Sequence, residues 1–277
     1  VAGAAGDRVD GGAVRAAHRV VFVGGAGADV FSGGAGNDTF ELRAANLGGA
    51  DRLRGAGGSD RLVLTSAGTI ANLGVFAGIE TLVLSNAGKN TLVLGDGNFA
   101  GVTGKTITVL GGSAGNAVNA STLSAANRVV LVGGGGTDIL RAGDGRDTLT
   151  ALRHATMTGG AGGDLFELEM PGASANPDTN RIVDFHPAQG DELAFSNSGF
   201  GLGLARASAA PKALPARLFS ARTNGIFDKP GERFAYDKST GRLYFDGDGS
   251  GATDSRQLVA TLSNHAAVTA SDLFFVS

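Results

Sequence analysis

The sequence predicts an all-β fold, a parallel β-roll or β-helix solenoid followed by a β-rich C-terminal cap, and three observations lead to this prediction. First, a nine-residue pattern of the form G-G-x-G-x-D-x-U-x, where U is a large apolar residue, occurs in tandem. Second, glycine accounts for 47 of the 277 residues, tryptophan is absent and aromatic residues make up 6%. This composition favours a thin core of small or aliphatic side chains. Third, short apolar runs alternate along the chain with Asn, Asp, Gly and Pro turns, as strands do.

The nine-residue pattern is strongest in two arrays. The first lies near residues 24–63, and its last turn, at 55–60, replaces one glycine by alanine but keeps the aspartate. The second lies near residues 133–167. The aspartate and the apolar residue hold a fixed register through five turns, which a flexible glycine linker does not require. No helix-period stretch follows the glycines, so a dinucleotide-binding fingerprint is not favoured either.

Each position of the pattern has a chemical reason. The glycines allow backbone conformations that other residues avoid, and they turn carbonyl oxygens inward. A hard cation such as Ca²⁺ takes about six to eight oxygen ligands, and the aspartate completes such a shell. The apolar residue begins a short strand that points into the core, so one nonapeptide is expected to form half a coil. At a coil spacing of about 4.8 Å, stacked carboxylates repel by about 0.9 kcal/mol even in water, and calcium reverses this repulsion.

The pattern therefore predicts several calcium sites, and no catalytic residue or other cofactor is expected in the chain. The predicted ligands are the glycines and aspartates of the repeat turns: Gly24, Gly25, Gly27, Asp29, Gly33, Gly34, Gly36, Asp38, Asp51, Gly55, Gly58, Asp60, Gly133, Gly134, Gly136, Asp138, Gly143, Gly145, Asp147, Gly159, Gly160, Gly162 and Asp164.

The pattern weakens between the two arrays, although its spacing of about nine to eleven residues mostly persists. The acidic position is occupied there by Glu80, Asn90, Asn116 and Asn127. Asparagine is neutral and glutamate is one methylene longer, so these coils are expected to bind calcium weakly or not at all. Packing and hydrogen bonds should hold them instead. The repeat domain is predicted to span residues 1–170.

The remaining residues, 171–277, are predicted to form the cap. A solenoid needs one because its open end exposes unpaired strand edges and core. Residues 203–222, rich in Ala and Arg, are expected to form a loop with a short helix. Strands are predicted at 181–185, 192–195, 233–236, 242–246 and 257–262.

One acidic segment of the cap leaves two interpretations open. Asp246, Asp248, Ser250 and Asp254 have the spacing that opens an EF-hand loop, but Gln257 at its twelfth position offers no bidentate carboxylate. The segment is either an extra calcium site or a polar hairpin turn.

Other classes of function find little support. The formal charge of −3 and the pI near 5.8 provide no basic surface for nucleic acid. No cysteine is present, no apolar run is long enough to span a membrane, and the N-terminus does not resemble a signal peptide. Ser113 lies in a G-x-S-x-G sequence without a following helix, and the four histidines form no H-E-x-x-H motif. Neither a serine hydrolase nor a zinc protease is predicted.

Taken together, these motifs resemble the C-terminal region of repeats-in-toxin (RTX) proteins, which Gram-negative bacteria export by type I secretion. The arrays at 24–41, 133–150 and 159–167 match the family's nonapeptide. The segment at 181–193 is similar to the one that follows the repeats in secreted RTX proteases and adhesins. Residues 234–251 look like the family's terminal hairpin, and 269–277 look like its uncleaved secretion signal.

The resemblance implies a calcium-dependent folding, structural and export module, secreted or held at the cell surface of a Gram-negative bacterium. Its implied partners are the type I secretion machinery and a cell surface or an upstream domain. An adhesin or surface-layer protein fits best. The alternative is the non-catalytic C-terminal part of a secreted protease, lipase or epimerase, with the active site upstream of Val1. A third alternative is that the middle coils bind a carbohydrate or a partner protein.

Overall fold

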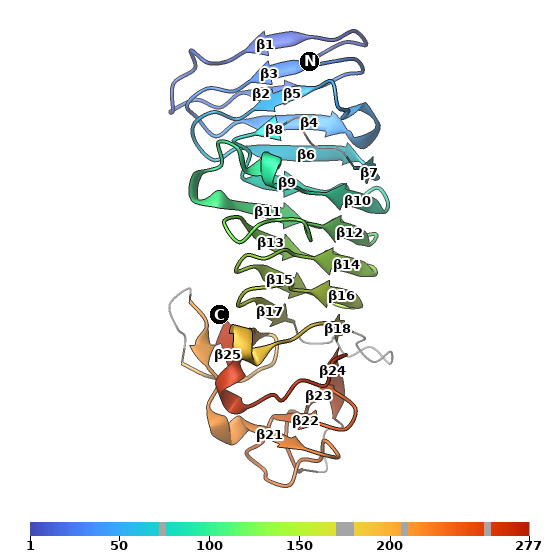
Figure 1. Cartoon of the computed structure of the whole chain (residues 1–277), viewed down its shortest axis with the longest axis vertical. Helices are drawn as coiled ribbons and strands as arrows, with labels where there is room; N and C mark the ends of the chain where they lie inside the picture. The colour runs from blue at the N-terminus through green and yellow to red at the C-terminus, as the bar shows by residue number, and fades with distance from the viewer. Residues whose placement is uncertain (72–75, 170–179, 206–209, 252–255, 277) are drawn as a thin grey trace. The chain divides into compact units, whose positions relative to one another are not determined.

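The computed structural model is all-β with mostly parallel sheets, as the sequence predicts (Figure 1). Strands and short 3-10 helices make up its regular structure, and no helix within the described residues is long and apolar enough to cross a membrane. The chain forms two compact units, Val1–Gly145 and Arg146–Ser277, which are described in turn. The described residues are 1–71, 76–169, 180–205, 210–251 and 256–276.

The first unit consists of three sheets of short strands. The strands are β1 (Arg8–Asp10), β2 (Val21–Val23), β3 (Val30–Ser32), β4 (Thr39–Arg43), β5 (Arg52–Arg54), β6 (Arg61–Ser66), β7 (Gly68–Ile70), β8 (Phe76–Ala77), β9 (Thr81–Val83), β10 (Asn90–Val93), β11 (Thr106–Leu110), β12 (Asn116–Asn119), β13 (Arg128–Val132) and β14 (Asp138–Arg141). The 3-10 helices are η1 (Ala44–Asn46), η2 (Asp96–Phe99) and η3 (Thr103–Lys105). The sheet orders are β1-β3-β5-β8, β2-β4-β6-β9-β11-β13 and β7-β10-β12-β14, and every pair is parallel.

The chain of this unit winds as a solenoid because successive strands pass from one sheet to another. Val21 pairs with Thr39, 18 residues later, so this coil contains two nonapeptides as predicted. Thr39 pairs in turn with Arg61, 22 residues later, and this coil is longer than two nonapeptides. The expectation of half a coil per nonapeptide is therefore wrong outside the first array. Longer turns account for the difference, including the one that holds η2 and η3.

The unit exchanges one of its sheets midway. The coil that begins at β6 contributes to all three sheets, because β7 starts the sheet β7-β10-β12-β14 while β8 ends the sheet β1-β3-β5-β8. The sheet that contains β6 and β9 continues through the whole unit (Figure 1).

The apolar residues of the repeats fill the core, which is aromatic at its N-terminal end. Phe22 stacks on Phe31 and Phe40, with ring centroids 5.3 and 4.9 Å apart. Leu53 and Leu62 continue the two columns because they pair with Phe31 and Phe40. The expectation of a small or aliphatic core is wrong here, since three neighbouring apolar positions carry phenylalanine. Each such buried side chain contributes about 1.5–3 kcal/mol.

The second unit combines parallel coils with antiparallel strands. Its strands are β15 (Thr148–Ala151), β16 (Ala155–Thr158), β17 (Leu165–Leu168), β18 (Asn180–Ile182), β19 (Glu192–Ser196), β20 (Lys212–Ala213), β21 (Phe219–Arg222), β22 (Phe234–Asp237), β23 (Arg242–Phe245), β24 (Gln257–Leu262) and β25 (Leu273–Val276), with 3-10 helices η4 (Pro187–Gln189), η5 (Ala216–Leu218) and η6 (Ala270–Asp272). Within this unit the sheet orders are β15-β17-β19-β25-β20 and β16-β18-β24-β23-β22-β21.

Parallel stacking continues beyond residue 170 in this unit. β19 stacks on β17, β25 stacks on β19, and β24 stacks on β18, all parallel. Antiparallel pairs involve β20, β22 and β23, whose residues lie between those two coils in sequence. The predicted cap strands at 181–185, 192–195, 233–236, 242–246 and 257–262 correspond to β18, β19, β22, β23 and β24. The predicted domain boundary at residue 170 stays a prediction.

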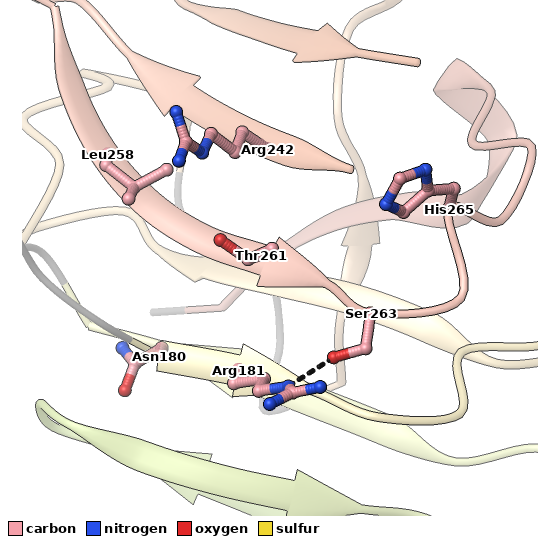
Figure 2. Close-up of a pocket in the computed structure, with 7 residues that line it drawn as sticks. All are labelled: Asn180, Arg181, Arg242, Leu258, Thr261, Ser263 and His265. Atoms are coloured by element: carbon pink, nitrogen blue, oxygen red, sulfur yellow. Dashed lines mark hydrogen bonds between the residues drawn. The ribbon is translucent and has the colours of Figure 1, made fainter. Parts of the chain in front are cut away.

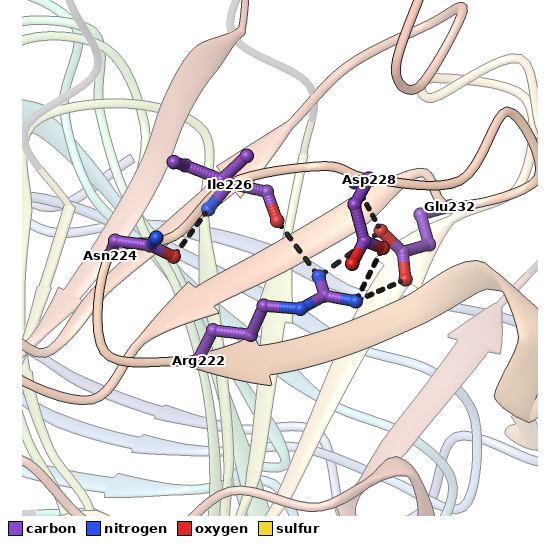
Figure 3. Close-up of polar contacts among 5 residues, drawn as sticks. All are labelled: Arg222, Asn224, Ile226, Asp228 and Glu232. Carbon is purple, nitrogen blue, oxygen red and sulfur yellow. Dashed lines mark hydrogen bonds and ion pairs between the residues drawn. The ribbon is translucent and has the colours of Figure 1, made fainter.

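A buried ion pair holds the loop between β21 and β22 (Figure 3). Arg222 binds both carboxylate oxygens of Glu232, Nη2 to Oε1 at 2.9 Å and Nη1 to Oε2 at 3.2 Å. Nη2 also contacts Asp228 Oδ1 at 2.6 Å, and Nη1 donates to the Ile226 carbonyl at 2.8 Å. Burial by itself would raise the pKa of Glu232, but the hydrogen bonds from Arg222 and from the Asp228 amide outweigh it and lower that pKa.

Candidate metal site: carboxylate ladders in glycine turns

A row of stacked aspartates precedes the strands of the sheet β1-β3-β5-β8. The Asp7 amide donates to Asp29 Oδ1 at 2.9 Å, and the Asp29 amide donates to Asp51 Oδ1 at 2.8 Å. Each carboxylate therefore accepts the backbone N–H of the equivalent residue one coil earlier. We call such a row a carboxylate ladder.

A second carboxylate ladder precedes the strands of the neighbouring sheet. The Val20 amide donates to Asp38 Oδ1 and the Asp38 amide to Asp60 Oδ1, both at 2.6 Å. The Asp60 amide donates to Glu80 Oε2 at 2.8 Å. Glu80 thus occupies the next position of the ladder despite its extra methylene.

The second unit contains a ladder of its own. The Asp147 amide donates to Asp164 Oδ1 at 2.8 Å, and the Asp164 amide donates to Asp191 Oδ1 at 2.9 Å. The carboxylate of Asp184 spans the same glycine turn, because its two oxygens accept the amides of Gly159 and Gly160, each at 2.9 Å.

Several ladder carboxylates carry one oxygen without a hydrogen-bond partner. Asp29, Asp60, Asp138 and Asp164 are at most 1% exposed, and Oδ2 of each is buried and unpartnered. Burying an ionised carboxylate in this way is costly unless a positive charge compensates it. These four oxygens are therefore suited to a cation.

The glycines let the carboxylates fold back over their own turns. A Cβ on Gly55 would lie 2.2 Å from Asp60 Oδ2, and a Cβ on Gly159 would lie 2.3 Å from Asp164 Oδ2. Only glycine fits at these positions without displacing the carboxylate. The fourth glycine of the turn has a different reason, since Gly162 adopts a φ of 114°, which side chains disfavour.

The electrostatics of the ladders match their burial. Burial raises the pKa of Asp60 to about 6, and the neighbouring charges of Asp38 and Glu80 add to the rise. Burial likewise raises the pKa of Asp164 to about 7, assisted by Asp147, Asp191 and Asp184. Carboxylates in this state oppose folding at neutral pH unless a cation binds them.

The available donors fit calcium. A Cβ on Gly25 would lie 1.6 Å from the Gly3 carbonyl oxygen, and one on Gly134 would lie 2.0 Å from that of Gly112. Carbonyl oxygens of one coil thus face the glycine turn of the next. Within the described residues, no three His, Cys, Asp or Glu side chains form a metal-binding group. Carbonyl oxygens would have to supply much of the shell, and a set of oxygens only is what calcium prefers.

The comparison with protein families agrees with this donor set. The family model of the RTX calcium-binding nonapeptide repeat (4 copies) matches residues 21–46, 47–64 and 129–153. The chain is an RTX-repeat protein. Its RTX repeats are a calcium-binding motif, and they make the repeat region a calcium-binding structural module. No curated protein and no solved structure matches the chain.

The RTX repeats bury all seven predicted aspartates. Each is at most 1% exposed: Asp29, Asp38, Asp51, Asp60, Asp138, Asp147 and Asp164. Six of them take part in the carboxylate ladders described above, and Asp138 belongs to a different row. The turn at 159–167, predicted as a repeat, lies outside the family match but carries the same orphaned carboxylate. The role of these residues and their glycines as metal ligands stays a prediction.

An amide ladder replaces the carboxylates in the middle coils. Asn90 Nδ2 donates to Asn116 Oδ1, and Asn116 Nδ2 donates to Asp138 Oδ1, both at 2.9 Å. The Asn116 amide N–H also donates to Asp138 Oδ1, at 2.7 Å. Hydrogen bonds between neutral side chains thus perform the stacking here, and Asp138 ends the row.

Four ladder residues were not among the predicted ligands: Asp7, Glu80, Asp184 and Asp191. Asp184 and Asp191 belong to the segment at 181–193 that resembles the end of RTX repeats, and this resemblance could have indicated them. Asp7 closes the partial repeat that begins at Gly3, whose amide donates to Asp7 Oδ2 at 2.7 Å.

Two other motifs keep a limited role. Asp246 is buried and accepts the Asp248 amide at 3.1 Å, but Asp254 lies outside the described residues. An extra calcium site there stays open. Ser113 lies in the turn between β11 and β12, where its amide donates to Asn86 Oδ1 at 3.0 Å, and no helix follows it.

Proposed function

We propose that the chain is a calcium-dependent folding, structural and export module of a protein that a Gram-negative bacterium secretes through type I machinery. The observation that carries the proposal is the set of buried Oδ2 atoms of Asp29, Asp60, Asp138 and Asp164, which have no hydrogen-bond partner inside glycine turns. A cation supplies the positive charge that these oxygens need. Their stacking links that charge to the fold.

The ladders give the module its dependence on the medium. Where calcium is scarce, buried carboxylates with raised pKa values disfavour the folded state, which leaves the chain in a form that can be threaded. Extracellular calcium modules bind with Kd values of about 10⁻⁴–10⁻³ M, close to calcium levels outside cells. At ten times its Kd, each site adds about 1.4 kcal/mol. Several sites can therefore decide whether the chain folds.

An adhesin or surface-layer protein is the context that we favour. The amide ladder of Asn90 and Asn116 makes the middle coils a scaffold held by hydrogen bonds, and such a scaffold suits a spacer at a cell surface. The gene sequence distinguishes this context from that of a secreted enzyme. Further repeats would support the adhesin, whereas a catalytic motif would support the enzyme.

Circular dichroism tests the proposal directly. The purified chain is stripped with a chelator and titrated with calcium up to about 10 mM, above the expected Kd range. We expect a cooperative increase of β signal that magnesium does not reproduce. A chain that is fully folded in chelator, with no response to calcium, would contradict the proposal.

A further inference from the structure

An open cavity of about 440 Å³ lies on the second unit, away from the carboxylate ladders (Figure 2). Its volume falls in the range of small-molecule sites. Neither the RTX repeats nor the proposed function gives it a role. Its walls come from β18, β23, β24 and the turn after β24, and they include Arg181, Arg242, Leu258, Thr261, Ser263 and His265.

Strand register brings two arginines to this cavity. Arg181 pairs with Thr261, and Thr261 pairs with Arg242, so the three side chains form a row across β18, β24 and β23. Adjacent strands are about 4.8 Å apart, so the arginines stand about 10 Å apart with the threonine hydroxyl between them. Both arginine side chains are exposed, whereas the next residues along β18 and β24, Ile182 and Leu262, are buried.

The two guanidinium groups are not neutralised by an acid. Neither forms an ion pair with any residue in the described part of the chain. Arg181 Nε donates to Ser263 Oγ, which orients the guanidinium and leaves its other N–H groups for a ligand. Asp237 pairs in register with Arg242, but its Oδ1 already accepts the Ser239 amide and hydroxyl at 2.8 and 2.7 Å. The cavity thus carries net positive charge.

Hydrogen bonds fix the wall opposite the arginines. The Ser263 amide donates to the Ile182 carbonyl at 2.8 Å, and Asn264 Nδ2 donates to the Phe185 carbonyl at 2.8 Å. Tyr236 Oη donates to the Ala266 carbonyl at 2.9 Å. His265 sits between these anchors with a φ of 51°, so its ring is held at the edge of the cavity. The site is therefore formed before any ligand arrives.

We propose that this cavity binds a small ligand through a carboxylate, sulfate or phosphate group held between Arg181 and Arg242. Guanidinium groups recognise such oxyanions through paired hydrogen bonds, and the hydroxyls of Thr261 and Ser263 add neutral partners. A volume of about 440 Å³ exceeds that of an inorganic ion and leaves room for a ring of sugar size, against which Leu258 presents an apolar surface.

Isothermal titration calorimetry on the full chain in millimolar calcium tests the site. The probes are sulfate, D-glucuronate and D-glucose, the last having a similar ring without the carboxylate. We expect saturable binding of sulfate, glucuronate or both, and none of glucose. R181Q and R242Q should each weaken binding by about tenfold, because each removes charge-assisted hydrogen bonds. R217Q, which removes an exposed arginine elsewhere in the same unit, should leave binding unchanged.

The outcomes separate the sources of the oxyanion. Binding of sulfate alone identifies an inorganic anion site, and stronger binding of glucuronate identifies an acidic sugar site. The absence of saturable binding of both anions, or equal affinities in R181Q, R242Q and R217Q, would overturn the proposal. Calcium-dependent circular dichroism of each variant confirms that it folds, and R242Q carries the test alone if R181Q does not. The cavity can fail this test while calcium-dependent folding holds.

Discussion

Asp60 combines two opposing demands in one side chain. Its Oδ1 accepts the Asp38 amide at 2.6 Å, whereas its Oδ2 is buried without a partner. The first oxygen fixes the stacking of the coils, and the second is available to a cation. A ladder aspartate is thus a favourable ligand and an unfavourable core residue.

D60N should separate these two roles. The asparagine keeps the Oδ1 acceptor but removes the charge, so we expect the calcium midpoint of folding to rise. The loss corresponds to about 1.4 kcal/mol at a calcium concentration ten times the Kd of the site. A calcium titration followed by far-UV circular dichroism measures it. D144N is the matched control, because Asp144 is exposed in a neighbouring glycine turn and lies outside the carboxylate ladders. Equal midpoints for D60N and D144N would remove Asp60 from the set of ligands.

Acid should stabilise the chain when calcium is absent. The pKa values of Asp60 and Asp164 are raised in the folded state to about 6 and about 7. The folded state therefore holds these protons more tightly than the unfolded state, whose pKa is about 3.9. This stabilisation is complete below about pH 4 and is lost as the pH rises through 6 to 7.

Thermal unfolding in chelator at pH 5 and pH 8 checks that sign. The melting temperature should be higher at pH 5, and the difference should shrink in the double variant D60N/D164N. Glu232 and Asp237, whose pKa values are lowered, titrate below this window and do not obscure it. A higher melting temperature at pH 8 in chelator would show that the ladder carboxylates are not held as described.

Sequence reasoning located the ladder aspartates because their chemistry is local. The glycines and the aspartate of one turn lie within six residues, so a single nonapeptide encodes the fold of its turn. The continuation to Glu80 and Asp191 was missed, since those residues join a ladder only through pairing with a coil 20 to 27 residues away. The cavity arginines were missed for the same reason, because Arg181 and Arg242 meet only across β24.

At the scale of elements, β10 and β12 form a stack that needs no metal. N116A should remove the amide that joins Asn90 to Asp138 and leave buried partners unsatisfied, at a cost of about 2 kcal/mol. The cost should be the same with calcium and with chelator. Urea unfolding followed by far-UV circular dichroism measures both values. N119A, on the same strand but only partly buried, should cost little. A cost that calcium abolishes would make this row part of a metal site.

The Arg222 and Glu232 pair should stabilise the second unit through burial. The Glu232 side chain is 3% exposed, so E232Q leaves Arg222 without its buried partner and should cost about 3 kcal/mol. D228N should cost far less, because the Asp228 side chain is 57% exposed and exposed ion pairs contribute at most about 1 kcal/mol. The two tyrosines, Tyr236 and Tyr244, both lie in this unit, so tyrosine fluorescence during urea unfolding reports on it. Equal losses from E232Q and D228N would contradict the buried pair.

The strands themselves were partly predictable. The x-U-x-U runs gave β6, β9 and β10 their positions, because alternation of buried and exposed side chains is a local signal. The exchange of sheets at β7 and β8 was not predictable from it. Nor was the pairing of β18 with β24, since Asn180 and Ala260 are 80 residues apart and no nonapeptide joins them.

At the scale of the whole molecule, each unit contains both kinds of support. The first unit has two carboxylate ladders and the amide ladder. The second has the ladder that ends at Asp191, together with the Arg222 pair and an aromatic cluster in which Phe195 and Phe234 stack at 4.2 Å. Calcium therefore acts on each unit, while each retains contacts that do not respond to it.

The ladders also have a direction. In each step the earlier coil donates its amide and the later coil supplies the carboxylate, as Asp29 does toward Asp51 and Asp38 toward Asp60. A coil newly added at the C-terminal end therefore finishes the one before it, whereas a coil lost from the N-terminal end leaves behind only an acceptor that water can satisfy. The two ends of the stack are chemically unequal, and a growing or trimmed stack of such coils would be sealed from one side only.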